Sequence, residues 1–252
     1  MRNWMMAILP LALVTGCNGA APGDQKQGER SEAGPPSHVG PIVSQSYALT
    51  GFTGVEVTGP DDITIRQGDA FSITARGRRE TLDRLDIKLD GATLSIGRKR
   101  EGFSLSSRDE DDLDIAITMP RLIKARLTGS GSIDADRVDG DAVEAVVTGS
   151  GDLKVAKLSG NRAEMTLSGS GDVEIGGGTV GAGEISVTGS GDVDAEGLVV
   201  KALKVSITGS GNVDAQATDT ADIRIQGSGD AKIAGGATCT TKQMGSGTAT
   251  CK

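Results

Sequence analysis

Aromatic residues and histidine are scarce in this sequence, and each scarcity excludes a kind of core or functional site. Phe, Trp and Tyr make up 2% of its 252 residues, so a core built around aromatic side chains is not expected. Trp4, the one tryptophan, lies near the N-terminus, which leaves the rest of the chain without an indole platform for sugar rings. His38, the one histidine, lies in a polar stretch, so the folded part has no histidine for a catalytic triad.

Basic residues are also outnumbered. Lys and Arg total 26 against 34 Asp and Glu, and the formal net charge is −8. Binding to nucleic acid needs a basic face that neutralises phosphates, so we expect no nucleic-acid partner.

Glycine, by contrast, is abundant, with 38 residues, and much of it belongs to one recurring phrase. Thr148-Gly149-Ser150-Gly151-Asp152 is typical, and its copies start 20 residues apart and later 18 apart. Repetition at this period predicts a solenoid. We expect a tight corner at the first glycine of each copy, since glycine adopts backbone angles that a side chain forbids. These glycines are Gly129, Gly149, Gly169, Gly189, Gly209, Gly227 and Gly245.

Apolar residues alternate with mostly polar ones on both sides of each phrase. Val147 and Ala145 precede the second copy, while Leu153 and Val155 follow it, and the other copies match. A period of two predicts strands, so each coil should hold two short strands flanking the corner. The sequence therefore predicts an all-β fold, a parallel β-helix with coils of about 20 residues.

The N-terminus predicts export. Residues 1–16 carry one early Arg and an apolar run too short to span a bilayer, as in a secretory signal. Val14-Thr15-Gly16-Cys17 resembles the lipobox of bacterial lipoproteins, which implies that Cys17 becomes a lipid anchor. The alternative is an ordinary signal peptide with an incidental cysteine. Residues 17–41 are rich in Gly, Pro and charge, so we expect a lipid-anchored flexible linker before a β-helix domain over 42–252.

The first part of that domain, 42–124, is expected to hold irregular coils, followed by regular repeats over 125–252. Thr58-Gly59-Pro60 echoes the phrase and predicts a first, degenerate coil. Asp90-Gly91 predicts a hairpin, Arg78 to Leu82 a short helical turn, and Pro120 the end of a strand. The charged stretch 97–112 is interpreted as a solvated loop, with a recognition loop as the alternative. The segment before residue 120 could cap the stack.

Two long runs carry a family resemblance: GFTGVEVTGPDDITIRQGD and DIAITMPRLIKARLTGSG. Together with the serial phrases, they resemble the bacterial family called putative auto-transporter adhesin, head GIN domain, over roughly residues 50–235. The resemblance implies a right-handed parallel β-helix on an exported protein. It supplies no catalytic residues.

Cys239 and Cys251 both fall on the inward parity near the C-terminus, so we expect a disulfide in an exported protein. The alternative is two buried free thiols.

An acidic row follows the corners, at Asp152, Asp172, Asp192 and Asp230, with Asn212 in the same register. One hypothesis is a calcium-bound edge, because stacked carboxylates repel and calcium takes several oxygen ligands. The favoured interpretation is that these side chains bond nearby backbone amides. Asn212 and Ser132 interrupt the row, and its spacing differs from that of calcium-binding β-rolls.

These features predict a non-catalytic, lipid-anchored protein of the bacterial envelope, with a role in adhesion, ligand binding or envelope architecture. No cofactor is expected beyond the lipid on Cys17. The expected partners are the membrane, through that lipid, and a protein or glycan ligand, with the outer membrane favoured. Alternatives are a calcium- or glycan-binding module and, less favoured, a polysaccharide-active enzyme, since the acids lie in rows instead of facing across a cleft.

Overall fold

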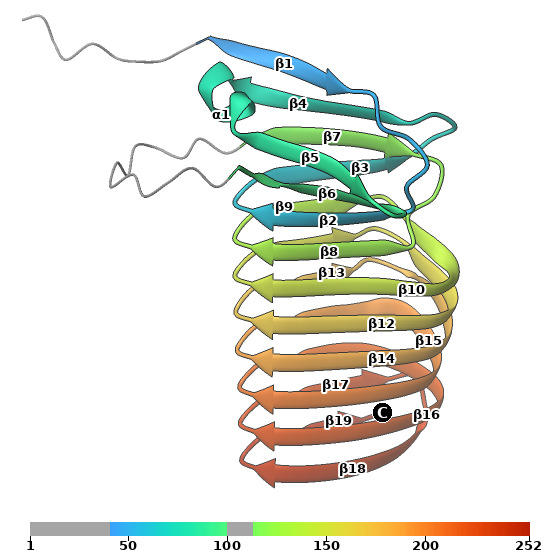
Figure 1. The fold of residues 1–252 in the computed structure, drawn as a ribbon. Helices are drawn as coiled ribbons and strands as arrows, with labels where there is room; N and C mark the ends of the chain where they lie inside the picture. Colours follow the sequence, from blue (N-terminus) through green and yellow to red (C-terminus); the bar gives the residue numbers. More distant parts are fainter. Residues whose placement is uncertain (1–40, 100–112) are drawn as a thin grey trace, which may run out of the picture. The chain divides into compact units, whose positions relative to one another are not determined.

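Stacked parallel strands form the body of the protein (Figure 1). The computed structural model describes residues 41–99 and 113–252, all within one compact unit, Val39–Lys252. These residues form a β-solenoid of about six turns with coils of about 20 residues, as the repeat period predicts. Each coil places its residues directly over the matching residues of the previous coil, for example Thr148 over Thr128.

The first wall of the stack consists of the strands that run into the corners. The phrases end these strands, so residues before each corner share one register. In stacking order they are β2 (Gly54–Gly59), β8 (Lys124–Gly129), β10 (Val138–Gly149), β12 (Leu158–Gly169), β14 (Gly178–Gly189), the later parts of β15 (Val193–Gly209) and β16 (Val213–Gly227), and β18 (Thr238–Gly245).

The second wall consists of the strands that leave the corners. They are β3 (Asp62–Gln67), β9 (Ser132–Ala135), β11 (Asp152–Val155), β13 (Val173–Ile175), the first residues of β15 and β16, β17 (Ala231–Ala234) and β19 (Ala249–Cys251).

A third side closes each coil, because β10, β12 and β14 are longer than the short strands that the sequence predicts. The long strands β10, β12 and β14 begin on the third side and bend into the first wall, so that Val138 lies over Leu158 well before the corner. Val138, Leu158 and Leu198 are fully buried there. These three residues lie at the same offset before their corner glycines, but Gly178 takes that position in β14 and interrupts the apolar column, which is why the sequence pattern did not resolve this side.

The interior is a set of aliphatic columns. The residues predicted to point inward are buried: Leu127, Val147, Leu167 and Ile207 before the corners and Ile133, Leu153, Val173 and Val213 after them have at most 2% of their surface exposed. Like residues lie over like at the strand spacing of about 4.8 Å. No coil encloses a core by itself, so stability arises from stacking neighbours.

An inserted segment covers the first coil. Asp62 in β3 lies beside Ser132 in β9, 70 residues later, and between them the described residues of β4 to β7 lie above this coil (Figure 1). The insert contains β4 (Ser72–Arg78), α1 (Arg79–Asp83), β5 (Leu85–Asp90), β6 (Thr93–Arg98) and β7 (Asp114–Met119), and β1 (Ile42–Tyr47) pairs with β4. The predicted degenerate coil, hairpin, helical turn and strand end at Pro120 are all confirmed.

Several predictions lie outside the described residues. These are the signal sequence 1–16, the lipidated Cys17, the linker up to residue 40 and most of the charged loop, residues 100–112. Between residues 41 and 252, apart from that gap, no helix is both long and apolar enough to cross a membrane.

Candidate functional site

The corner glycines are structural residues. Gly189 has φ +126°, and a Cβ there would lie 2.2 Å from the carbonyl oxygen of Gly169 in the coil before it. The second glycine is just as tightly enclosed, since a Cβ on Gly191 would lie 2.0 Å from the Gly171 oxygen. The corner backbones bond to one another, as when the Ser190 amide donates to the Gly169 carbonyl at 2.9 Å. Glycine is therefore required by stacking and does not signal a phosphate or metal loop.

The acidic row forms a ladder of hydrogen bonds between coils. The backbone amide of Asp172 donates to the Asp152 carboxylate at 3.1 Å, and the amide of Asp192 donates to the Asp172 carboxylate at 3.1 Å. The row continues through Asn212, whose amide oxygen accepts from the backbone of Asp230 at 3.1 Å. The side chains thus accept from backbone amides of the next coil. The expectation that they would bond amides of their own turn was wrong.

The last rung holds the most strongly engaged carboxylate. Asp230 accepts from both the hydroxyl and the backbone amide of Thr248, at 2.7 and 2.8 Å. The hydrogen bond from the Thr248 hydroxyl, followed by that from its amide, lowers the pKa of Asp230. Across residues 41–99 and 113–252, no three His, Cys, Asp or Glu side chains converge as a metal site would require.

A second surface feature is an uncharged strip on the outer face of the first wall and its corners, which we call the hydroxyl strip. Every member except Val146 carries a hydroxyl, and matching members lie over one another in β10, β12, β14 and β15. The strip consists of Val146, Thr148, Ser150, Thr166, Ser168, Ser170, Ser186, Thr188, Ser190, Ser206, Thr208 and Ser210.

The hydroxyls of this strip are available to a ligand. Thr148, Thr188 and Thr208 are exposed, and none of their side-chain hydroxyls hydrogen bonds to another described residue. The corner serines at 150, 170, 190 and 210 are exposed as well. The outward polar positions were visible in the sequence, but their assembly into one continuous face depends on the stacking.

Charged residues frame the strip on every side. Arg126 donates to Glu144 at 2.5 Å above it, and Arg224 donates to Asp222 at 2.9 Å below it. Glu144 also lies 3.3 Å from Lys124. Partial burial raises the pKa of Glu144, but the hydrogen bond from Arg126 and the two nearby cations outweigh this effect and lower it overall.

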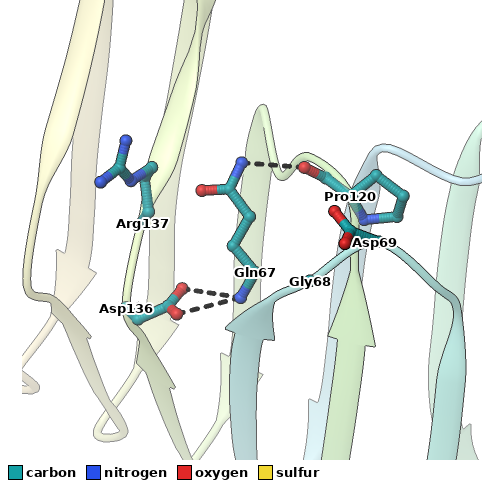
Figure 2. Close-up of a pocket in the computed structure, with 6 residues that line it drawn as sticks. All are labelled: Gln67, Gly68, Asp69, Pro120, Asp136 and Arg137. Atoms are coloured by element: carbon teal, nitrogen blue, oxygen red, sulfur yellow. Dashed lines mark hydrogen bonds between the residues drawn. The ribbon is translucent and has the colours of Figure 1, made fainter.

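A polar pocket of about 470 Å³ lies where the insert leaves and rejoins the stack. The backbone amide of Gln67 donates to both carboxylate oxygens of Asp136 at 3.0 Å, and its side-chain amide donates to the Pro120 carbonyl at 2.8 Å (Figure 2). Asp69 and Arg137 lie on opposite sides of Gln67. The sequence does not reveal this pocket, because its walls come from three distant segments.

A disulfide joins Cys239 of β18 to Cys251 of β19, with their Cα atoms 6.6 Å apart. Both residues are half-buried and pack against the core, so the bridge crosses the interior of the last coil. The structure thus agrees with the pairing expected from inward parity.

The described chemistry suits binding more than catalysis. The predicted acids lie along an edge and are occupied by backbone amides, while His38 lies outside the described residues. The exposed hydroxyls of the strip and the ion pairs beside it can form hydrogen bonds with a ligand.

Solved structures from Bacteroides and Parabacteroides species share this fold. A putative adhesin from Bacteroides fragilis aligns with a TM-score of 0.73 at 20% identity, covering 84% of this chain and 97% of that one. A putative lipid binding protein from Parabacteroides distasonis has a TM-score of 0.64 at 22% identity, covering 84% and 96%. A putative adhesin from Parabacteroides merdae has a TM-score of 0.64 at 18% identity, covering 84% and 96%. At these identities the likeness establishes the fold alone.

None of the curated proteins matches this sequence. The family described as "Putative auto-transporter adhesin, head GIN domain" matches residues 51–237, which span the first coil, the insert and nearly all the regular coils. The solenoid, its corner phrases and this match together place the chain in that family.

Proposed function

We propose that this protein is a non-catalytic, adhesin-like binding module that a lipid on Cys17 holds at the bacterial cell envelope. The observation that supports this proposal is the hydroxyl strip. Its exposed Thr and Ser hydroxyls have no hydrogen-bond partner among the described residues and repeat in register along the stack. The family name and the adhesin-like neighbours support the same broad role.

The ladder along the acidic row weakens the alternative of a calcium module. One oxygen of each carboxylate, Oδ1, accepts a backbone amide from the next coil, so each acid already helps to hold coils together. The alternative of a polysaccharide-cleaving enzyme needs an acid and a base facing one substrate bond, and the rows supply no such pair among the described residues.

Anchoring is tested by cell fractionation. Wild-type protein is expected in the membrane fraction, whereas Cys17→Ser should appear in soluble or secreted fractions, because the thiol that would carry the lipid is gone. Cys239→Ser serves as the matched control, since that cysteine belongs to the folded end. Equal membrane retention of Cys17→Ser and wild type would contradict the anchor.

Binding is tested by adhesion and pull-down. Cells that display the protein are compared with a deletion strain for attachment to surfaces and to neighbouring cells. Detergent-purified full-length protein is used in parallel to capture components from an envelope extract. We expect either capture of a specific envelope component or stronger attachment than in the deletion strain. If neither is observed, the binding role is refuted.

A further inference from the structure

We infer that the hydroxyl strip binds a neutral, linear polysaccharide that runs along the stack and crosses several coils. This inference rests on the proposed binding function and names the surface and the ligand chemistry. It starts from the side chains of the strip, whose hydroxyls both donate and accept hydrogen bonds.

The charge pattern selects a neutral ligand. Glu144, Glu164 and Glu184 line one long side of the strip, and the row Asp152, Asp172 and Asp192 lines the other. Lys204 follows the three glutamates in the same column and pairs with Glu184, while Glu144 is paired with Arg126 and Lys124. The first side therefore carries mostly paired charges and the second is acidic, which disfavours phosphate- and carboxylate-bearing polymers, while the strip itself carries no charge that would require a counter-charge. An uncharged polyol meets no electrostatic penalty there.

The repeat selects a polymer. Thr148, Ser168, Thr188 and Thr208 lie in one column because their coils are in register. The column spacing is that of paired strands, about 4.8 Å, which is comparable to the advance per unit of an extended pyranose chain. A ligand with its own regular hydroxyls can therefore contact successive coils in the same way, directly or through water.

The absence of aromatics explains why the contact must be long. No aromatic side chain belongs to the strip, so ring stacking does not contribute. A single neutral hydrogen bond contributes only about 0.5–1.5 kcal/mol net. Affinity must therefore come from many repeated contacts on one chain, and we expect short oligosaccharides to bind poorly.

The experiment uses full-length protein in detergent and neutral β-1,4- and α-1,4-linked glucan oligomers of increasing length as probes. Titration calorimetry should give affinity that rises with oligomer length and changes little with added salt, because neither partner relies on charge at the strip. Polygalacturonate is the charged comparison and should bind more weakly.

The strip is tested by the triple variant Thr148→Val, Thr188→Val and Thr208→Val. Valine keeps the branched shape and strand preference while removing each hydroxyl, so the fold should remain. If each hydroxyl contributes about five-fold, the triple variant should bind on the order of 100-fold more weakly. The matched control is Thr179→Val with Thr220→Val, two exposed threonines outside the strip, which should leave affinity unchanged.

Three results would overturn this inference: no neutral glucan binds, polygalacturonate binds more tightly, or the triple variant behaves like the control. If an envelope component is still captured in those cases, the binding role stands and only the ligand and surface are wrong. Concentration-dependent dimerisation abolished by the triple variant, without glucan binding, would assign the strip to a second copy of the chain instead.

Discussion

Arg98 and Asp61 form a buried ion pair that ties the insert to the first coil. The Arg98 guanidinium donates to one carboxylate oxygen at 2.7 Å and to the other at 3.4 Å, and Asp61 has no exposed side-chain surface. The backbone amide of Leu113 donates to the same carboxylate at 3.2 Å. Asp61 occupies the position that Gly131 holds in the next coil, and a side chain fits there because the insert, not another corner, lies above it.

Asp61→Asn should destabilise the protein by about 3 kcal/mol, because it removes the negative partner of a buried cation and weakens three hydrogen bonds. Urea unfolding followed by circular dichroism measures the change. Asp62→Asn is the matched control, since that exposed neighbour accepts only from the Ser132 hydroxyl at 2.6 Å. Equal losses in both variants would show that the ion pair does not hold the insert.

Gly189→Ala should cost about 3 kcal/mol or more, since alanine would be strained at φ +126° and its Cβ would meet the Gly169 backbone. Gly236→Ala separates the two causes, because Gly236 has φ +79° and a methyl group added there would meet nothing within 4 Å. We expect the Gly236 variant to lose only about 1 kcal/mol. A similar thermal shift in both would mean that stacking adds nothing to the glycine requirement.

Asp172→Asn should be neutral or slightly stabilising, while Asp172→Ala should cost about 1 kcal/mol. Asparagine keeps an oxygen that can accept the Asp192 amide, as Asn212 does for Asp230, and it removes repulsion along the row. Thermal melts of both variants, with and without calcium, measure this. Calcium that raises the melting temperature of wild type but not of Asp172→Asn would contradict the ladder as the main role.

Replacing both bridged cysteines by serine should expose the last coil to local opening. The bridge closes a sequence separation of 12, and a loop of that size contributes about 3 kcal/mol in the chain-entropy view. Hydrogen exchange should quicken in β18 and β19 but stay unchanged in β12 and β14. In wild type, thiol titration of the native protein should detect neither cysteine.

The Arg126–Glu144 pair should make stability depend on pH. The folded pKa of Glu144 lies below its ordinary value of 4.5, so the pair stabilises the fold above that pH and its contribution fades as pH falls through the folded pKa. At pH 7, Glu144→Gln should cost less than about 1 kcal/mol, because the pair is partly exposed. The cost should shrink near pH 3. A double-mutant cycle with Arg126→Met isolates the pair, and a coupling independent of pH would contradict it.

The repeat allowed the stacked coils and the residues of their interior to be predicted from the sequence. Val147, Leu153 and their counterparts recur at fixed offsets from the corner, so parity alone assigned them to the interior. The third side was not predicted because glycines interrupt its apolar columns: Gly178 lies between Leu158 and Leu198, and Gly160 lies beside Val180. The pocket beside Gln67 was not predicted, because the contacts between residues 67, 120 and 136 depend on where the insert rejoins the stack.

That coils with glycine corners and alternating aliphatic residues must stack follows from the repeat alone, because no single coil can bury its own inner face. The inward parity of Cys239 and Cys251 follows from the repeat as well. The role of the acidic row depends on the three-dimensional stacking, since its oxygens accept from amides one coil away, a separation of 20 residues along the chain. Only stacking, likewise, turns single threonines into a continuous hydroxyl strip, because register between coils is a property of paired backbones and not of any one repeat.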